Sequence, residues 1–362
     1  MSLLFNLSMM HKALPKKKRF INSINYFRGL AIILIVLGHS NDLAGYDMSS
    51  NLEALLLALI KNSTVYFVFI SGFLYYHIFY HKFNYKKFMI KKTQYVLLPY
   101  LLISIIPIML TVFMLDGGQV LPDSLRDRPL LAIIWYFFTG KVIVAYWYIP
   151  MAMLLFAISP LVNLIIGSNV VLPVVLFLLP ISVMVHRPLN NLNAFHSLVY
   201  FFPVYLIGVW SSINHKKIYA YLKDNQKKII LALIALTFAV IQIWIFKQEN
   251  SFYKDFFSIT VPDVNLLQKI TLCFLFISIL DNYEDTNFVI LNKIAETSFA
   301  IYFIHPFILN ILAAVFSRLD LNYEGNFFTF IFVALGMVIG SMAIAFAIKA
   351  VFKKKSRYLI GW

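Results

Sequence analysis

The chain has 362 residues, of which 61% are apolar and only 13% are charged. A soluble domain of this length needs more polar surface, so the composition excludes a soluble globular protein and indicates an integral membrane protein. The single cysteine, Cys273, excludes a disulfide within the chain and a cysteine-based metal cluster.

The net charge of +15 would suit a nucleic-acid-binding protein, but the position of the basic residues argues against that class. Short basic groups such as "PKKKRF" and "KKKSR" each lie beside a long apolar run, and there is no separate basic domain. That distribution is typical of membrane topology, in which lysine and arginine flank the spans. We expect the lipid bilayer, and no nucleic acid, as a partner.

Apolar segments of about 20 residues are long enough to cross a bilayer. The sequence predicts an all-α polytopic membrane protein with ten transmembrane helices. Only "GSN" separates the fourth from the fifth, so this pair forms either a tight hairpin or a distorted element. The shorter segment "RPLLAIIWYFFTGK" before the fourth is expected to be interfacial or re-entrant. The predicted spans are residues 24–44, 54–77, 94–115, 145–166, 170–186, 197–213, 229–247, 264–281, 295–316 and 327–349.

The lysines and arginines between these spans orient the chain. If both termini are cytoplasmic, the cytoplasmic segments hold 21 of the 31 lysines and arginines, as the positive-inside rule favours. We therefore predict a basic cytoplasmic segment at 1–23, a transmembrane domain at 24–349 and a basic cytoplasmic tail at 350–362. The alternative, a cleavable signal peptide at the first span, is disfavoured because no small-x-small cleavage pattern follows it.

The first span, in "YFRGLAIILIVLGHS", carries two ionisable residues, Arg28 and His39. At 100° and 1.5 Å per residue they share one helix face and lie about 16 Å apart along the axis. Asp42 follows one turn after His39. A lone arginine often reaches for lipid headgroups, and a lone histidine often only joins two helices by a hydrogen bond. Together they suit an anionic ligand held at Arg28 whose reactive end reaches His39.

These residues resemble a known family. "FRGLAIILIVLGH" fits the Arg-x10-His signature of the membrane acyltransferase-3 family, bacterial multi-pass enzymes that O-acylate surface glycans. Similar segments follow in the order of that family, namely "FVFISGFLYY", "FMIKKTQYVLLPY", "WYIPMAMLLFAISPLV", "FFPVYLIGVW" and "SFAIYFIHPFIL". There is one departure. The family's third span often opens Arg-x-x-Arg, whereas Lys92 and Tyr95 occupy these positions here, so the second cation is absent unless Lys91 compensates.

The resemblance implies an O-acyltransferase of the bacterial plasma membrane. Its donor would be a cytoplasmic acyl-CoA, acetyl-CoA first among them. Its acceptor would be a hydroxyl of an extracytoplasmic or surface polysaccharide such as O-antigen, capsule or exopolysaccharide. Arg28, Lys91 and Lys92 would hold the CoA phosphates, and His39 would act as general base or carry the acyl group. Asp42 would orient the imidazole, or would only bind water at the end of the span. No metal is expected.

Four further residues are candidates for substrate binding, and each has a structural alternative. His305 precedes Pro306, so it either helps to repair the hydrogen bonding that the proline disrupts or lines a cavity beside Tyr302. Trp147 is either an interfacial anchor or a platform for a sugar. Ser71, with its neighbour Gly72, either allows close helix packing through small residues or contacts substrate.

Charged residues near two other spans complete the candidates. Arg187, with His186 and His196, lies by the outer loop before the sixth span, where it is placed to contact a glycan. Glu296 is expected at the start of the ninth span, where a carboxylate stabilises a helix N-terminus.

The main alternative function is a polysaccharide exporter or permease, because polar residues facing a membrane cavity also suit a transporter. Transporters often show repeated halves with broken helices, and the sequence has no such symmetry. A third class is a structural subunit of a polysaccharide synthase. The sequence leaves open the acyl group, a homo-oligomer, and whether a glycan-assembly partner completes the transfer.

Overall fold

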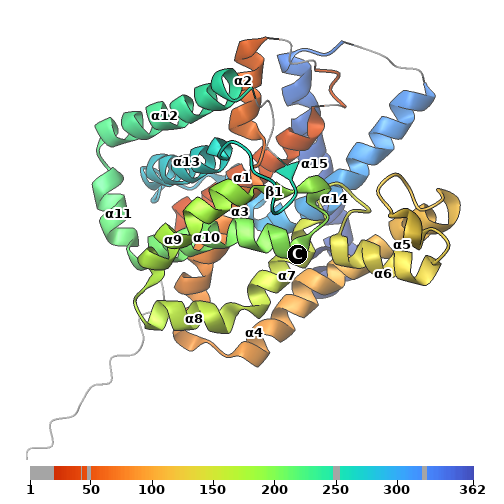
Figure 1. Ribbon diagram of the computed structural model, residues 1–362, viewed down its shortest axis with the longest axis horizontal. Helices are drawn as coiled ribbons and strands as arrows, with labels where there is room; N and C mark the ends of the chain where they lie inside the picture. The colour runs from red at the N-terminus through yellow and green to blue at the C-terminus, as the bar shows by residue number, and fades with distance from the viewer. Residues whose placement is uncertain (1–19, 42, 47–49, 248–252, 320–323) are drawn as a thin grey trace, which may run out of the picture.

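The computed structural model describes residues 20–41, 43–46, 50–247, 253–319 and 324–362. This part of the chain is all-α apart from one pair of two-residue strands (Figure 1). Eight of its helical segments are long and apolar enough to cross a membrane, which confirms the predicted all-α polytopic architecture. The α-helices are α1 (Asn22–Ser40), α2 (Asn51–Ile60), α3 (Thr64–Leu74), α4 (Tyr85–Lys92), α5 (Leu98–Met114), α6 (Pro129–Thr139), α7 (Tyr148–Ala157), α8 (Ser159–Gly167), α9 (Val171–Val185), α10 (Ala194–Ile213), α11 (His215–Leu222), α12 (Asn225–Val240), α13 (Val264–Asp281), α14 (Val289–Arg318), α15 (Phe327–Phe352) and α16 (Ser356–Ile360).

The structure departs from the prediction at the fourth and fifth spans. α7 and α8 together reach the length of a span, but they are bent by 51°. Pro160 gives the reason, because it lacks the N–H that would bond to the carbonyl of Phe156 and continue α7. α9 has 15 residues, fewer than the about 20 that cross a bilayer. The described residues thus contain eight helices that are long and apolar enough to cross a membrane, or nine if the bent pair is one span, against the ten predicted. The side on which each terminus lies stays a prediction.

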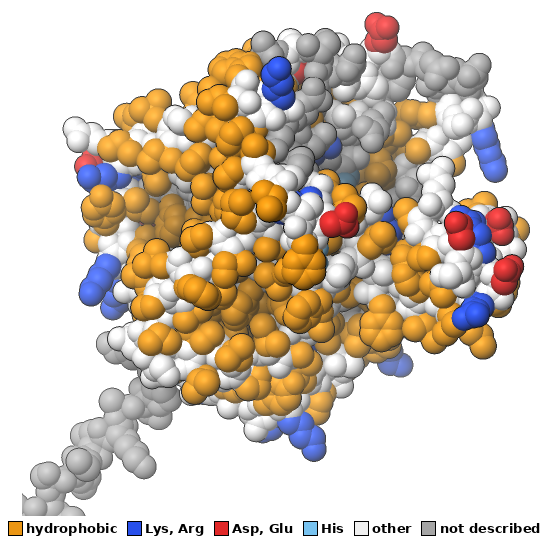
Figure 2. Space-filling view, in the orientation of Figure 1, with side chains coloured by type: hydrophobic (Ala, Val, Ile, Leu, Met, Phe, Trp, Pro, Cys, Tyr) orange, Lys and Arg blue, Asp and Glu red, His pale blue; other side chains and the backbone are white. Residues whose placement is uncertain are grey.

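The helices divide into a buried group and a group that faces outward. In the apolar stretch of α10, 72% is buried inside the protein. In that of the helical segment Asn225–Ile245, which contains α12, only 22% is buried. Figure 2 shows that hydrophobic side chains cover most of the visible face and that lysine and arginine lie mainly towards its edges. An apolar surface of this extent suits contact with lipid.

α3 and α10 cross at two glycines. A Cβ added to Gly72 would lie 2.0 Å from the carbonyl oxygen of Tyr205, and one added to Gly208 would lie 2.0 Å from that of Phe69. Only a residue without a side chain permits this approach of two backbones. The close packing that the sequence predicts at Ser71 and Gly72 is therefore confirmed at Gly72.

The predicted second span is broken between α2 and α3. Asn62 takes the left-handed conformation there, with φ of 64°, and its side chain is buried. Its Nδ2 donates to the Tyr200 hydroxyl and to Asn265 Oδ1, each at 3.1 Å. Lys269 of α13 donates to two carbonyl oxygens in the last turn of α2, at 2.6 and 2.8 Å. Contacts from α10 and α13 thus hold a turn within an apolar segment, where its backbone would otherwise lack partners.

The two short strands fix a loop beside this turn. β1 (Arg187–Pro188) pairs in parallel with β2 (Tyr253–Lys254), and Arg187 lies opposite Tyr253 in the register. His186 precedes the strand with φ of 58°, a conformation that ends α9 and redirects the chain. The pairing therefore places the Arg187 side chain at a defined point next to Tyr253.

The chain after α15 folds back onto the helices. A 3₁₀ turn at Lys353–Lys355 leads into α16, which packs against α5 and α14. Trp362 lies against α15, with its ring 5.1 Å from that of Phe346 and beneath the Lys349 ammonium at 3.5 Å. The segment predicted as a cytoplasmic tail is therefore packed against the helices.

Candidate functional site

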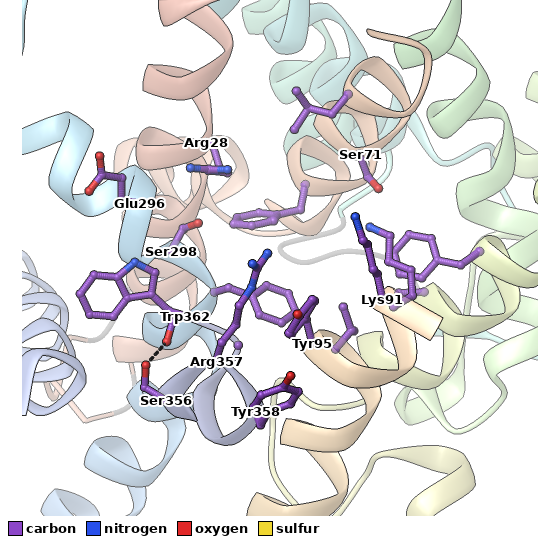
Figure 3. A pocket seen from close by; sticks show the side chains of 18 of the residues that line it. Arg28, Ser71, Lys91, Tyr95, Glu296, Ser298, Ser356, Arg357, Tyr358 and Trp362 are labelled. Carbon is purple, nitrogen blue, oxygen red and sulfur yellow. Dashed lines mark hydrogen bonds between the residues drawn. The ribbon is translucent and has the colours of Figure 1, made fainter. Parts of the chain in front are cut away.

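One cavity, here called the basic pocket, has a volume of about 950 Å³. Its lining brings together cations from three parts of the chain, and among the described residues Glu296 is its one carboxylate (Figure 3). Such an excess of positive charge in a cavity favours a ligand with several negative charges. The cations are Arg28, Lys91, Lys92, Lys349, Lys353, Lys354, Lys355 and Arg357.

Arg28 reaches the basic pocket from the first third of α1. Its Nη2 donates to Asn25 Oδ1 at 3.0 Å, and Asn25 is itself held by a hydrogen bond of 2.7 Å to Asn292 of α14. Its buried Nε has no hydrogen-bond partner among the described residues. A buried donor left unpaired costs free energy, so this N–H is available to a ligand in the pocket.

Lys91 and Lys92 are neighbours in α4 with different surroundings. Lys92 is enclosed by aromatic rings, and its ammonium lies 4.2 Å from the ring centre of Phe156 and 5.3 Å from those of Phe79 and Phe88. Lys91 is exposed and extends into the basic pocket (Figure 3). The rings hold Lys92 in place by cation–π attraction, whereas the Lys91 ammonium is exposed to the pocket.

The C-terminal segment supplies a cation at Tyr95, the position where the family's third span often has its second arginine. Arg357 of α16 lies over the ring of Tyr95 with its guanidinium carbon 4.0 Å from the ring centre. Tyr358 lies on the same side, with its ring 5.5 Å from that of Tyr95. An aromatic residue in place of an arginine thus becomes the platform for an arginine from elsewhere in the chain.

A small cavity, here called the neck, lies beside the basic pocket towards the other end of α1 and shares lining residues with it. Its volume is about 20 Å³, enough for about one water molecule. Phe67, Tyr148 and Phe299 line both the neck and the basic pocket. His39 lines the neck and also the cavity beyond it. The imidazole therefore lies between two cavities, one reached from each end of α1.

Tyr302 and His305 flank the neck from α14. Tyr302 lines it, and its hydroxyl donates to the carbonyl oxygen of Ala145 at 2.6 Å. His305 is buried and stacks on His39, with ring centroids 5.6 Å apart. Its Nδ1 bonds the carbonyl oxygen of Ile301 at 2.8 Å, so Nδ1 carries the proton and Nε2 is an acceptor. Nε2 has no partner among the described residues.

The cavity beyond the neck, here called the Arg187 pocket, has a volume of about 530 Å³. His39 and Trp147 form its inner wall, shared with the neck. Trp147 is 5% exposed, its ring stacks on Phe201, and the Arg187 guanidinium carbon lies 4.7 Å from its ring centre. Whether a sugar stacks on Trp147 stays a prediction.

The structure brings the candidates from the sequence together in two groups. Arg28, Ser71, Lys91 and Lys92 line the basic pocket, whereas His39, Trp147 and Tyr302 line the neck, with His305 stacked behind His39. Asp42 lies outside the described residues.

The sequence missed two parts of the basic pocket. Glu296 lines it, and it is not at a helix start because α14 begins at Val289. The C-terminal cations also line it, and only their high charge density marked them in the sequence.

No group of three or more histidine, cysteine, aspartate or glutamate side chains that could hold a metal ion occurs among the described residues. The described part of the chain therefore offers no preformed metal centre to add to the basic pocket, the neck and the Arg187 pocket.

Comparison with known proteins places this arrangement in a family. No curated protein and no solved structure matches the chain significantly. The family model described as an acyltransferase domain, Acyl_transf_3, matches residues 21–346. That range contains Arg28, His39, Lys91, Lys92 and His305, and it ends before the C-terminal cations. The chain belongs to the acyltransferase-3 family of membrane acyltransferases.

Proposed function

We propose that this membrane acyltransferase transfers an acyl group, acetyl in the first instance, from a cytoplasmic acyl-CoA to a hydroxyl of an extracytoplasmic polysaccharide. The observation that carries the proposal is the position of His39 in a neck between two cavities. The basic pocket would face the cytoplasm, as the lysine and arginine distribution favours. The setting would be a bacterial plasma membrane.

The basic pocket is suited to the donor. CoA carries a pyrophosphate and a 3′-phosphate, and guanidinium groups match phosphate oxygens in geometry and charge. Arg28 offers an unpaired buried N–H, and Lys91 offers an exposed ammonium. The pantetheine arm would extend along α1, over the about 16 Å of helix between Arg28 and His39. Phe67, Tyr148 and Phe299 would rotate to admit the thioester to the neck.

His39 would act as the general base in the transfer. Its unprotonated imidazole nitrogen takes the proton of the acceptor hydroxyl while the oxygen attacks the thioester carbonyl. The tetrahedral intermediate then expels the CoA thiolate, the C–S bond breaks, and the imidazolium returns the proton to sulfur. The products are the ester and free CoA thiol. In the covalent alternative the imidazole itself takes the acyl group first and passes it to the hydroxyl.

The narrowness of the neck supports transfer over export. A polysaccharide path needs an open channel, whereas the neck has room for about one water molecule. Only the acyl group would have to pass the level of His39.

The test uses purified protein in lipid nanodiscs with radiolabelled acetyl-CoA and polysaccharide. The wild type should form labelled ester with stoichiometric release of CoA thiol. His39→Ala should lower the rate by more than about 100-fold, because it removes the base, while acetyl-CoA binding at the basic pocket stays intact. Rapid quenching separates the two routes, since a labelled enzyme intermediate supports the covalent one. Ester formation by His39→Ala at the wild-type rate, or movement of unmodified glycan across a vesicle membrane without ester, would contradict the proposal.

A further inference from the structure

The Arg187 pocket combines three cations that come from separate elements. Lys61 ends α2, Lys141 follows α6 and Arg187 belongs to β1, and all three line this one cavity. All three are also close enough to act electrostatically on His39 at its inner end. No carboxylate lines the cavity among the described residues. Like charges gathered in a partly enclosed space repel each other, so the arrangement is unfavourable until an anion enters.

Arg187 is fixed by groups that leave its charge uncompensated. The side chain is buried, and its Nε and Nη2 donate to Asn191 Oδ1 at 3.2 and 2.8 Å, while Nη1 donates to Asn62 Oδ1 at 3.0 Å. Both acceptors are neutral amides. The rings of Trp147 and Tyr253 lie 4.7 and 4.9 Å from the guanidinium carbon. Two of the five N–H groups of the guanidinium remain for a ligand.

Asp263 is close enough to Arg187 to act on it electrostatically, but it does not form an ion pair with it. Asp263 is buried at the start of α13, where it accepts hydrogen bonds from the Tyr200 hydroxyl at 2.8 Å and from the Leu266 backbone N–H at 3.1 Å. It does not line the Arg187 pocket, and no ion pair joins it to Arg187 among the described residues. A rigid, buried and unpaired cation is costly to maintain, which points to a ligand that supplies the missing charge.

From these contacts we infer that the acceptor is an anionic glycan, a sugar whose carboxylate or phosphate group binds Arg187, Lys61 and Lys141 while its hydroxyl faces His39. The inference rests on the proposed function and names its substrate class. Arginine held edge-on by amides presents its remaining N–H groups as a fork, which fits the paired oxygens of a carboxylate or phosphate. Asn62 and Asn191 are positioning residues, because they act through Arg187.

The first experiment measures binding without catalysis. The His39→Ala variant in nanodiscs is titrated with glucuronan oligosaccharides and with the same oligosaccharides after reduction of the carboxyl groups, which keeps the linkage and removes the charge. The anionic form should bind at least about tenfold more tightly, and the difference should shrink as salt is raised. A phosphorylated mannan oligosaccharide and its unphosphorylated form distinguish a phosphate from a carboxylate ligand. Equal binding within both pairs would overturn the inference, even if acyl transfer itself fails.

The second experiment assigns the charge to the pocket. Lys61→Gln and Lys141→Gln should each raise KM for the anionic acceptor several-fold more than KM for the neutral acceptor. Arg128→Gln, an exposed cation on the same predicted side that lines none of the three cavities, is the matched control and should change neither. Equal loss of kcat with both acceptors would mean that the cations serve the reacting carbonyl instead, and would overturn the inference. Thermal unfolding of each variant shows whether the fold is kept.

Discussion

At the scale of single residues, Lys141 has a charge that depends on its surroundings. It lies outside the membrane-spanning segments, and burial, together with the nearby Arg187 guanidinium, lowers the pKa of its ammonium while Tyr253 opposes the shift. A lysine with a lowered pKa keeps its charge below that pKa and loses it at a lower pH than an ordinary lysine does. Besides Lys141, Arg187 and Tyr253, the titratable groups that line the Arg187 pocket are Lys61 and His39.

This shift predicts a pH dependence of acceptor binding. As the pH rises through the lowered pKa of Lys141, the wild type should lose affinity for an anionic oligosaccharide. Lys141→Arg should keep its affinity to higher pH, because a guanidinium stays protonated throughout. The dissociation constant is measured from neutral to alkaline pH in the His39→Ala background. Superimposable profiles for the two proteins would show that Lys141 does not titrate in this range.

At the scale of elements, the crossing of α3 and α10 leaves no room for a side chain at either of its two glycines. Gly208→Ala should destabilise the protein by more than the about 1–3 kcal/mol typical of an overpacked core, since the clash is with backbone that cannot rotate away. Gly336→Ala, in α15, is the control, because no atom lies within 4 Å of its added Cβ. The midpoint of thermal unfolding in detergent measures both. Equal midpoints would mean that the two helices separate easily.

The elements also show what the sequence can and cannot predict. Hydropathy locates most spans, because a bilayer requires long apolar runs whatever their contacts. It places the start of the ninth span at residue 295, whereas α14 begins at Val289, because helical hydrogen bonding continues outside the apolar region. It gives no sign of the turn at Asn62, which depends on Tyr200 and Asn265 from distant parts of the chain.

At the scale of the whole molecule, the C-terminal segment and α4 border the same basic pocket although they are far apart in the chain. Arg28 and His39 were identifiable from the sequence because charged groups inside an apolar run are costly and therefore conspicuous. Arg357 was not, since nothing local indicates that a basic tail will return to Tyr95. The site residues on single helices were thus open to prediction, whereas those brought in by tertiary contact were not.

Because the C-terminal segment folds back to line the basic pocket, we predict that its lysines contribute to donor affinity. Replacing Lys353, Lys354 and Lys355 together by glutamine should raise KM for acetyl-CoA several-fold. KM for 3′-dephospho-acetyl-CoA should rise less, because this donor has no 3′-phosphate for the lysines to bind. The control replaces Lys216 and Lys217 of α11, which line none of the three cavities, by glutamine. Initial rates over a range of donor concentrations give KM for each of the two donors. An unchanged KM in the triple variant would remove the segment from the donor site.

The neck has a consequence for the energetics of the membrane. If only the acyl group passes His39, it leaves the cytoplasmic thioester while the hydrogen of the acceptor hydroxyl ends on the CoA thiol. The exchange of an acyl group for a hydrogen moves no net charge across the bilayer. Moving one elementary charge would cost about 2.3 kcal/mol per 100 mV, and this reaction avoids that cost. On the proposed mechanism, the thioester alone drives the modification, and neither the membrane potential nor the proton gradient is consumed.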